Sequence, residues 1–375
     1  MKIKIKGFIT SKKSELYSDC ADNYAINREH NKFAISDGVS KSFFPKVWSD
    51  ILVKKYVDQK DWKDEEFIIE CQKEWQSKID EIVNQPETKW FTKSQYNRKD
   101  PALATFVGLQ FIESEQKWIA QALGDSFLFF ISKDSNKIKI QLSSKSEPII
   151  FDNFPDYLSS IGNSHKGEKK PIRGEKIENG TFYLMTDALA EWFLQNTEQA
   201  KQTLDNIKTQ EQYLETIKNE RNANRLNDDD SAVLIIEVID DEKKEFTYSN
   251  IEVTLLSELV KEKAEKLEEV KKKETSLIES FSNSNTEENK TELELAKDET
   301  SVNETTEEIV KQSTEIVKSD DTILETKFNE PENLKEESTD NSSEISDEKQ
   351  EGKLPEQISN GISDNPKTKS IFDKF

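Results

Sequence analysis

The segment KFAISDGVSKS, residues Lys32 to Ser42, contains the pattern on which the interpretation of this chain depends. An apolar run ends at Ser36, and Asp37-Gly38 follows it directly. Asp-Gly after a strand is common in tight turns, and a carboxylate at such a position is also a suitable ligand for a hard cation. A single Asp-Gly fits both interpretations. The choice depends on whether other carboxylates recur beside strand-like segments.

Carboxylates recur beside three further strand-like segments. Asp22 stands just before one of them, and Asp187 follows the apolar run of residues 182–185 after Thr186. The triplet Asp228 to Asp230 directly precedes another, residues 231–238. In an antiparallel sheet the end of one strand and the start of its neighbour share an edge. The sequence therefore allows these side chains to meet at one edge.

A fifth carboxylate, Asp125, lies with Gly124 between two apolar segments, where we expect a hairpin turn. Aspartate favours turns and strand caps, which is a sufficient explanation for any one of the five sites. Five such sites together favour a cluster, and clustered carboxylates repel each other, which suggests a hard cation. The histidines are His30 and His165, both in polar surroundings, so zinc and a histidine-based triad are disfavoured.

The composition limits the remaining classes of function. The chain has 375 residues, of which 33% are hydrophobic and 34% charged, so the whole length does not form a packed core. A net charge of -22 argues against nucleic acid and against anionic membrane surfaces as partners. Cys20 and Cys71 are expected to be free thiols. No segment has the pattern of a signal peptide or a membrane span, and we expect a cytoplasmic protein.

The chain divides into three parts by composition. Residues 1–240 alternate strand-like and helix-like segments in groups, which is typical of an α+β domain with antiparallel sheets. Residues 252–282 have the spacing of a lone helix or a short coiled coil. Residues 283–375 are rich in Glu, Ser, Thr, Asn and Lys, and we expect a disordered acidic tail. Its apolar end, residues 371–375, fits either a motif that docks a protein partner or an end without function.

The predicted elements follow from the spacing of apolar residues. Strands are expected at 2–8, 23–26, 32–36, 104–111, 118–123, 127–131, 137–142, 180–185 and 231–238. Helices are expected at 44–57, 65–83, 188–195 and 198–220.

The order of the motifs resembles the metal-dependent serine/threonine protein phosphatases of the PPM family, the type-2C phosphatases. The resemblance covers residues 1 to 240. Each motif is weak alone, but six in the same order are a specific signal. They are ADNYAI, FAISDGVSKS, ALATFVGLQF, WIAQALGDSFLFF, FYLMTDALAEW and DDDSAVLIIEV. The resemblance implies an α-β-β-α sandwich, in which two antiparallel sheets pack face to face between helices.

The same resemblance implies a dimetal centre that holds two core Mn²⁺ or Mg²⁺ ions, with a possible third. The residues that match the core ligands are Asp22, Asp37, Gly38 through its carbonyl, Asp187 and Asp228. Asp228 is preferred within its triplet because Asp-Asp-x-Ser then matches the Asp-Asn-x-Ser/Thr motif of the family. Asp125 and Glu191 match the third-metal positions. The implied reaction is hydrolysis of phosphoserine or phosphothreonine on proteins by a metal-activated water, in a circuit with a serine/threonine kinase.

The chain departs from the family pattern in three places. Tyr17 stands where many members carry an arginine that binds the substrate phosphate, and Lys12 or Lys13 could replace it. The histidine of the second motif is absent, and Glu191 stands where an aspartate is usual. Two alternatives therefore stay open: a catalytically weak phosphatase-like binding module with a partner-recruiting tail, and a phosphomonoesterase for small molecules.

Overall fold

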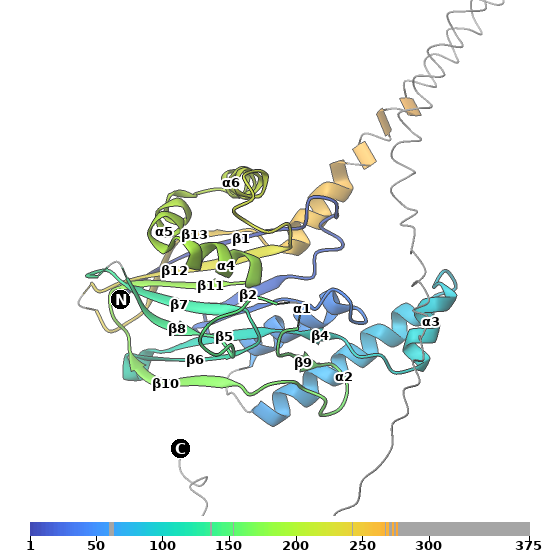
Figure 1. Ribbon diagram of the computed structural model, residues 1–375, viewed down its shortest axis with the longest axis horizontal. Helices are drawn as coiled ribbons and strands as arrows, with labels where there is room; N and C mark the ends of the chain where they lie inside the picture. Colours follow the sequence, from blue (N-terminus) through green and yellow to red (C-terminus); the bar gives the residue numbers. More distant parts are fainter. Residues whose placement is uncertain are drawn as a thin grey trace, which may run out of the picture. The chain divides into compact units, whose positions relative to one another are not determined.

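The computed structural model describes residues 1–59, 64–135, 137–152, 154–241, 243–266, 268–269, 272–273 and 275–276 (Figure 1). The predicted tail, residues 283–375, lies outside the described residues, as do several positions of the predicted linker at 252–282.

Two sheets form the centre of the fold. The six-stranded sheet has the order β13-β1-β12-β11-β7-β8, and its neighbours are antiparallel except for the parallel pair β1 and β13. Its strands are β13 (Thr247–Val253), β1 (Lys2–Thr10), β12 (Ser231–Ile239), β11 (Gly180–Met185), β7 (Phe127–Ser132) and β8 (Ile138–Leu142).

The second sheet has five antiparallel strands in the order β10-β6-β5-β3-β2. They are β10 (Lys170–Lys176), β6 (Lys117–Leu123), β5 (Phe106–Ile112), β3 (Lys32–Ser36) and β2 (Asn23–Asn27). A short pair, β4 (Leu103–Ala104) and β9 (Leu158–Ser159), lies beside it.

Aromatic side chains from both sheets form the core between them. Phe182 of β11 packs on Phe130 of β7, with ring centroids 4.5 Å apart. Phe182 also contacts Trp118 of β6 and Phe111 of β5, with centroids 5.1 and 5.3 Å apart. Phe182, Trp118 and Phe111 are each 1% exposed or less, so the sheets meet in a close-packed interior.

Helices cover the outer face of each sheet (Figure 1). On the five-stranded sheet lie α1 (Pro45–Asp58) and α2 (Asp64–Val83), and the shorter α3 (Trp90–Asn97) contacts α2. On the six-stranded sheet lie α4 (Asp187–Gln195), α5 (Thr197–Asn206) and α6 (Gln210–Asn222). The predicted α-β-β-α sandwich of two antiparallel sheets is therefore confirmed.

The sequence prediction missed the strands β9 and β10, and other elements also differ from it. The single helix predicted at 198–220 is two helices, because the chain leaves α5 at Ile207 and Thr209 caps α6 by accepting the Gln212 N–H. The helix α3 was not predicted, because it buries no side chain and so has no apolar face. The last strand, β13, lies beyond the predicted domain end at residue 240.

The predicted hairpin at Gly124-Asp125 is wrong. The two strands that flank it belong to different sheets, β6 to the five-stranded and β7 to the six-stranded one, so the turn is a crossing between sheets. Gly124 has a φ of +102°, and a Cβ there would lie 2.5 Å from Thr105 Cβ, so glycine is required. The crossing places the next residue, Asp125, between the sheets.

The described residues contain no helix that is long and apolar enough to cross a membrane. Cys20 and Cys71 are free and buried, as predicted.

The helical residues 256–266 pack on the core through Leu256 and Leu259, which are 6% and 8% exposed. We expect Leu259→Ala to lower the free energy of unfolding by about 2 kcal/mol, because it leaves a cavity at the end of the core. The exposed Lys261→Ala is the control and should change it by less than about 0.5 kcal/mol. Chemical denaturation measures both, and equal values would show that this helix is not part of the folded domain.

Candidate metal centre

Three carboxylates converge beside the crossing between the sheets. Asp37, Asp125 and Asp187 each offer an oxygen atom, and these atoms all lie within 4.8 Å of one another. They come from three separate places in the sequence: the end of β3, the crossing after β6 and the start of α4. We call these three residues the carboxylate cluster.

The backbone of Asp37 is fixed by Thr105, at the start of β5. The Asp37 N–H donates to Thr105 Oγ1 (3.2 Å), and the Asp37 carbonyl accepts the Thr105 N–H (2.8 Å). Thr105 Oγ1 also bonds Ser126 Oγ at 2.6 Å, which ties Asp37 to the crossing. Next to Asp37, Gly38 leaves no room for a side chain, because a Cβ would meet Pro45 of α1 at 2.9 Å. The chain at Asp37-Gly38 thus packs closely against the start of α1.

Asp187 is the first residue of α4, where a carboxylate is favoured by the free N–H groups and the helix dipole. Its Oδ1 accepts the Ala188 N–H at 2.6 Å. The preceding Thr186 accepts the Ala232 N–H on Oγ1 (3.0 Å), which fixes the start of α4 to β12. The hydroxyls of Thr186 and Ser126 are therefore engaged in the scaffold.

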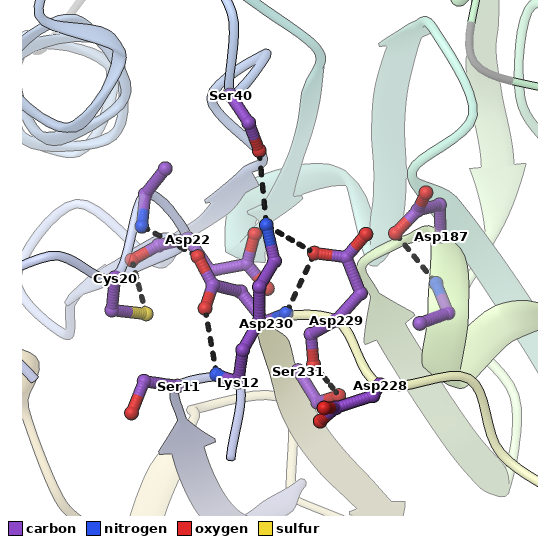
Figure 2. A network of polar contacts seen from close by, with 12 residues as sticks. Ser11, Lys12, Cys20, Asp22, Ser40, Asp187, Asp228, Asp229, Asp230 and Ser231 are labelled. Atoms are coloured by element: carbon purple, nitrogen blue, oxygen red, sulfur yellow. Dashed lines mark hydrogen bonds and ion pairs between the residues drawn. The ribbon is translucent and has the colours of Figure 1, made fainter. Parts of the chain in front are cut away.

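Asp228 is not a member of the carboxylate cluster, and Figure 2 shows it apart from Asp187. Asp228 is exposed, and its Oδ1 accepts the Lys13 N–H (3.0 Å) and lies 3.5 Å from Arg221 Nη1. Asp229 lies nearer, since its charge raises the pKa of both Asp37 and Asp187. The match to the family motif selected Asp228, but the effect of its charge on Asp37 and Asp187 favours Asp229.

Asp22 and Asp230 are buried side by side (Figure 2). Asp230 accepts the Lys12 N–H on Oδ1 (3.1 Å) and the Ala21 N–H on Oδ2 (2.7 Å), so it holds the loop between β1 and β2. Asp22 is 1% exposed, and burial together with the charges of Asp230 and Asp187 raises its pKa well above the usual range of a carboxyl. Asp22 therefore borders the cluster from the β2 side.

Glu191, on the next turn of α4, stands outside the three-residue cluster. Its Oε2 accepts a hydrogen bond from Asn227 Nδ2 at 2.7 Å. Its charge contributes to the raised pKa of Asp187, so it belongs to the surroundings of the site.

The pKa values show how strongly the cluster disfavours its own negative charge. Burial raises the pKa of Asp125 to about 6, against the opposing effect of Lys145. Burial and the charges of Asp125 and Asp229 raise the pKa of Asp187 to about 7. Burial and the charges of Asp22 and Asp187 raise the pKa of Asp37. A cation bound among these residues would remove that cost.

The site fits a hard divalent cation. Its donors are carboxylate oxygens, the ligands that Mg²⁺ and Mn²⁺ prefer. Two buried carboxylate oxygens, Asp22 Oδ2 and Asp125 Oδ1, have no hydrogen-bond partner among the described residues. Buried oxygens without partners are costly, and metal coordination is a way to satisfy them.

Tyr17 and two lysines, Lys12 and Lys145, bear on how the site could bind a phosphate group. Tyr17 does not reach the cluster as an arginine could, since its half-buried ring packs on the core between the sheets. Lys12 Nζ donates to Ser40 Oγ (3.1 Å) and pairs with Asp229 Oδ1 (3.1 Å). Figure 2 shows it near Asp22 and Asp229. Lys145, which the sequence gave no reason to select, pairs with Asp125 Oδ2 at 3.6 Å.

Comparison with solved structures finds phosphatases at low sequence identity. The photosystem II phosphatase PBCP matches over 63% of this chain and 99% of its own, with a TM-score of 0.44 and 12% identity. The catalytic domain of the serine/threonine protein phosphatase PstP, in complex with two manganese ions, matches over 64% and 99%, with a TM-score of 0.41 and 12% identity. RsbX in complex with magnesium matches over 63% and 96%, with a TM-score of 0.38 and 14% identity.

No family model matches the sequence, and no curated protein matches it. The solved structures therefore resemble this chain in fold alone, at 12–14% identity.

Proposed function

We propose that this chain is a metal-dependent phosphoprotein phosphatase of the type-2C class, which hydrolyses phosphoserine or phosphothreonine with Mn²⁺ or Mg²⁺. The observation that carries the proposal is the carboxylate cluster. Asp37, Asp125 and Asp187 come together from three separate parts of the chain, although burial raises the pKa of each and repulsion within the cluster also raises those of Asp37 and Asp187. A fold that only needed turn residues would have no reason to place three acids, one buried and two partly buried, against one another.

The proposed metal ligands are those predicted from the sequence, with one change that the positions of the side chains require. Asp22, Asp37, the Gly38 carbonyl and Asp187 are the core set. Asp229 replaces Asp228, because Asp228 faces Lys13 and Arg221 instead of the cluster. Asp125 and Glu191 are the set for an additional ion.

The chain's own residues prepare the site in two ways. Thr105 and Ser126 hold Asp37 against the crossing, so the ligands are already oriented when a cation arrives. The hydroxyls of Ser126 and Thr186 bond the scaffold, so no covalent intermediate on these residues is invoked. Bound Mn²⁺ or Mg²⁺ supplies a water of lowered pKa and neutralises the charge of the phosphoryl group.

Hydrolysis of a phosphothreonine peptide by the full chain tests the proposal. We expect turnover in Mn²⁺, loss of turnover in EDTA, and recovery when Mn²⁺ is added back. Activity on p-nitrophenyl phosphate but on no phosphopeptide would indicate a small-molecule phosphomonoesterase. Metal-dependent binding of the phosphopeptide without turnover would indicate the phosphatase-like binding module.

A partner for this activity is a serine/threonine kinase that supplies the phosphoprotein. This part of the proposal follows from the reaction class, since a phosphoprotein substrate must first be made by a kinase.

A further inference from the structure

Lys145 is a partly buried cation beside the cluster with no role in the proposed ligand set. It lies in the segment that follows β8, and its side chain is 14% exposed. Its Nζ lies 3.6 Å from Asp125 Oδ2 and 3.2 Å from Asp152 Oδ1. Lys145 therefore forms an ion pair with a member of the carboxylate cluster, as Lys12 does with the proposed ligand Asp229.

The position of Lys145 is set by the backbone. Ser144 and Gly124 are hydrogen-bonded in both directions: the Ser144 N–H donates to the Gly124 carbonyl (3.1 Å), and the Gly124 N–H donates to Ser144 Oγ (2.9 Å). Ser144 is buried and also donates to Asp156 Oδ2 at 2.8 Å. The residue after Ser144 is thereby placed beside the residue after Gly124, which is Asp125.

Asp152 holds the ammonium group of Lys145 on its other side. Its carboxylate accepts the Phe154 N–H (2.9 Å), and this bond together with Lys145 lowers the pKa of Asp152, so it stays charged. Lys145 thus lies between an exposed carboxylate and the cluster, with its ammonium group at the border of the site. The ammonium is 3.6 Å from an oxygen of the cluster, so an anion bound at the cluster would lie near it.

We infer that Lys145 binds the phosphoryl group of the substrate, a role for which Tyr17 offers no positive charge. This inference rests on the proposed function, because a phosphoryl group is the anion that the site would receive. A phosphate monoester dianion approaching several carboxylates needs a cation beside them. A lysine ammonium can serve as a point charge for phosphate.

The binding of inorganic phosphate to the Mn²⁺-loaded full chain, measured by calorimetry, tests this role. We expect Lys145→Gln to weaken phosphate binding about tenfold, and Lys145→Arg to stay within about threefold of wild type, because it keeps the charge. The matched control is Lys139→Gln, which removes a nearby exposed lysine that pairs with Glu178. Its phosphate affinity should equal that of wild type.

Mn²⁺ binding separates this role from a structural one. Removing a cation beside Asp125 should leave Mn²⁺ affinity unchanged or increase it. If Lys145→Gln binds Mn²⁺ more weakly by the same factor as phosphate, Lys145 supports the fold of the site and the inference is overturned. Phosphate affinity equal to wild type in Lys145→Gln also overturns it.

The kinetic arm distinguishes failure of the inference from failure of the proposed function. If wild type hydrolyses the phosphopeptide, Lys145→Gln should raise KM more than it lowers kcat. If wild type hydrolyses nothing but its phosphate affinity depends on Lys145, the proposed reaction fails and the anion-binding role stands.

Discussion

Asp37→Asn and Asp187→Asn are each expected to lower Mn²⁺-dependent hydrolysis of a phosphothreonine peptide by about 100-fold or more. Each change removes a charged ligand from the cluster. Even substitution of a residue that only hydrogen-bonds a metal ligand typically lowers metal affinity or activity by about 10–100-fold. Both residues lie within 4.8 Å of the other members of the cluster, so neither is easily replaced. Steady-state kinetics at saturating Mn²⁺ measures the effect.

The aspartate triplet supplies the matched control for this prediction. Asp228→Asn should keep activity within about threefold of wild type, since its carboxylate faces solvent and Lys13. Asp229→Asn should lose activity as Asp37→Asn does. Near-normal turnover in Asp37→Asn and Asp187→Asn, with folding verified by circular dichroism, would remove the basis of the proposed site.

The metal-free protein is expected to become less stable as the pH rises from 5 to 8. The folded-state pKa values of Asp125 and Asp187, about 6 and about 7, lie above the usual carboxyl value. The folded state therefore binds these protons more tightly than the unfolded state does. Their stabilising effect is complete below the unfolded pKa, near 4, and is lost as the pH rises through 6 and 7. The expected loss is on the order of 3 kcal/mol.

Thermal unfolding in EDTA at a series of pH values measures this dependence. Asp125→Asn should raise Tm at pH 8 and flatten the profile, because it removes one of the groups that must lose a proton. Asp152→Asn is the control, since the pKa of Asp152 is lowered and the flattening should be absent. Saturating Mn²⁺ should reverse the trend, because metal ligands must be deprotonated. A Tm that is independent of pH without metal would contradict the buried cluster.

Much of the fold could be predicted because its strands have strong apolar patterns. The segments 32–36 and 180–185 were predicted with the bounds that β3 and β11 have. The sheet crossing at Gly124 could not be predicted, because a glycine turn between two apolar strands looks the same in a hairpin. The choice of sheet is made by the long-range packing of β6 and β7, which no local pattern records.

The candidate site was also predictable in part. Asp37, Asp125 and Asp187 were found because each stands within two residues of a strand. The choice among residues 228–230 depends on the conformation of the chain before β12. The position of Lys145 depends on the hydrogen bonds between Ser144 and Gly124. Contacts between residues 20 positions apart in an irregular segment leave no periodic signal in a sequence.

The origin of the cluster in both sheets has a consequence for how the protein tunes metal binding. Asp37 is carried by the five-stranded sheet, Asp187 follows a strand of the six-stranded sheet, and Asp125 stands where the chain passes between them. The separation of the ligands is therefore set by the thickness of the interior, which large rings such as Trp118 and Phe182 determine. Cation affinity then becomes a property of the whole sandwich. Substitutions in its apolar filling can change metal selectivity without touching a ligand, and a bound ion in turn resists any sliding of one sheet over the other.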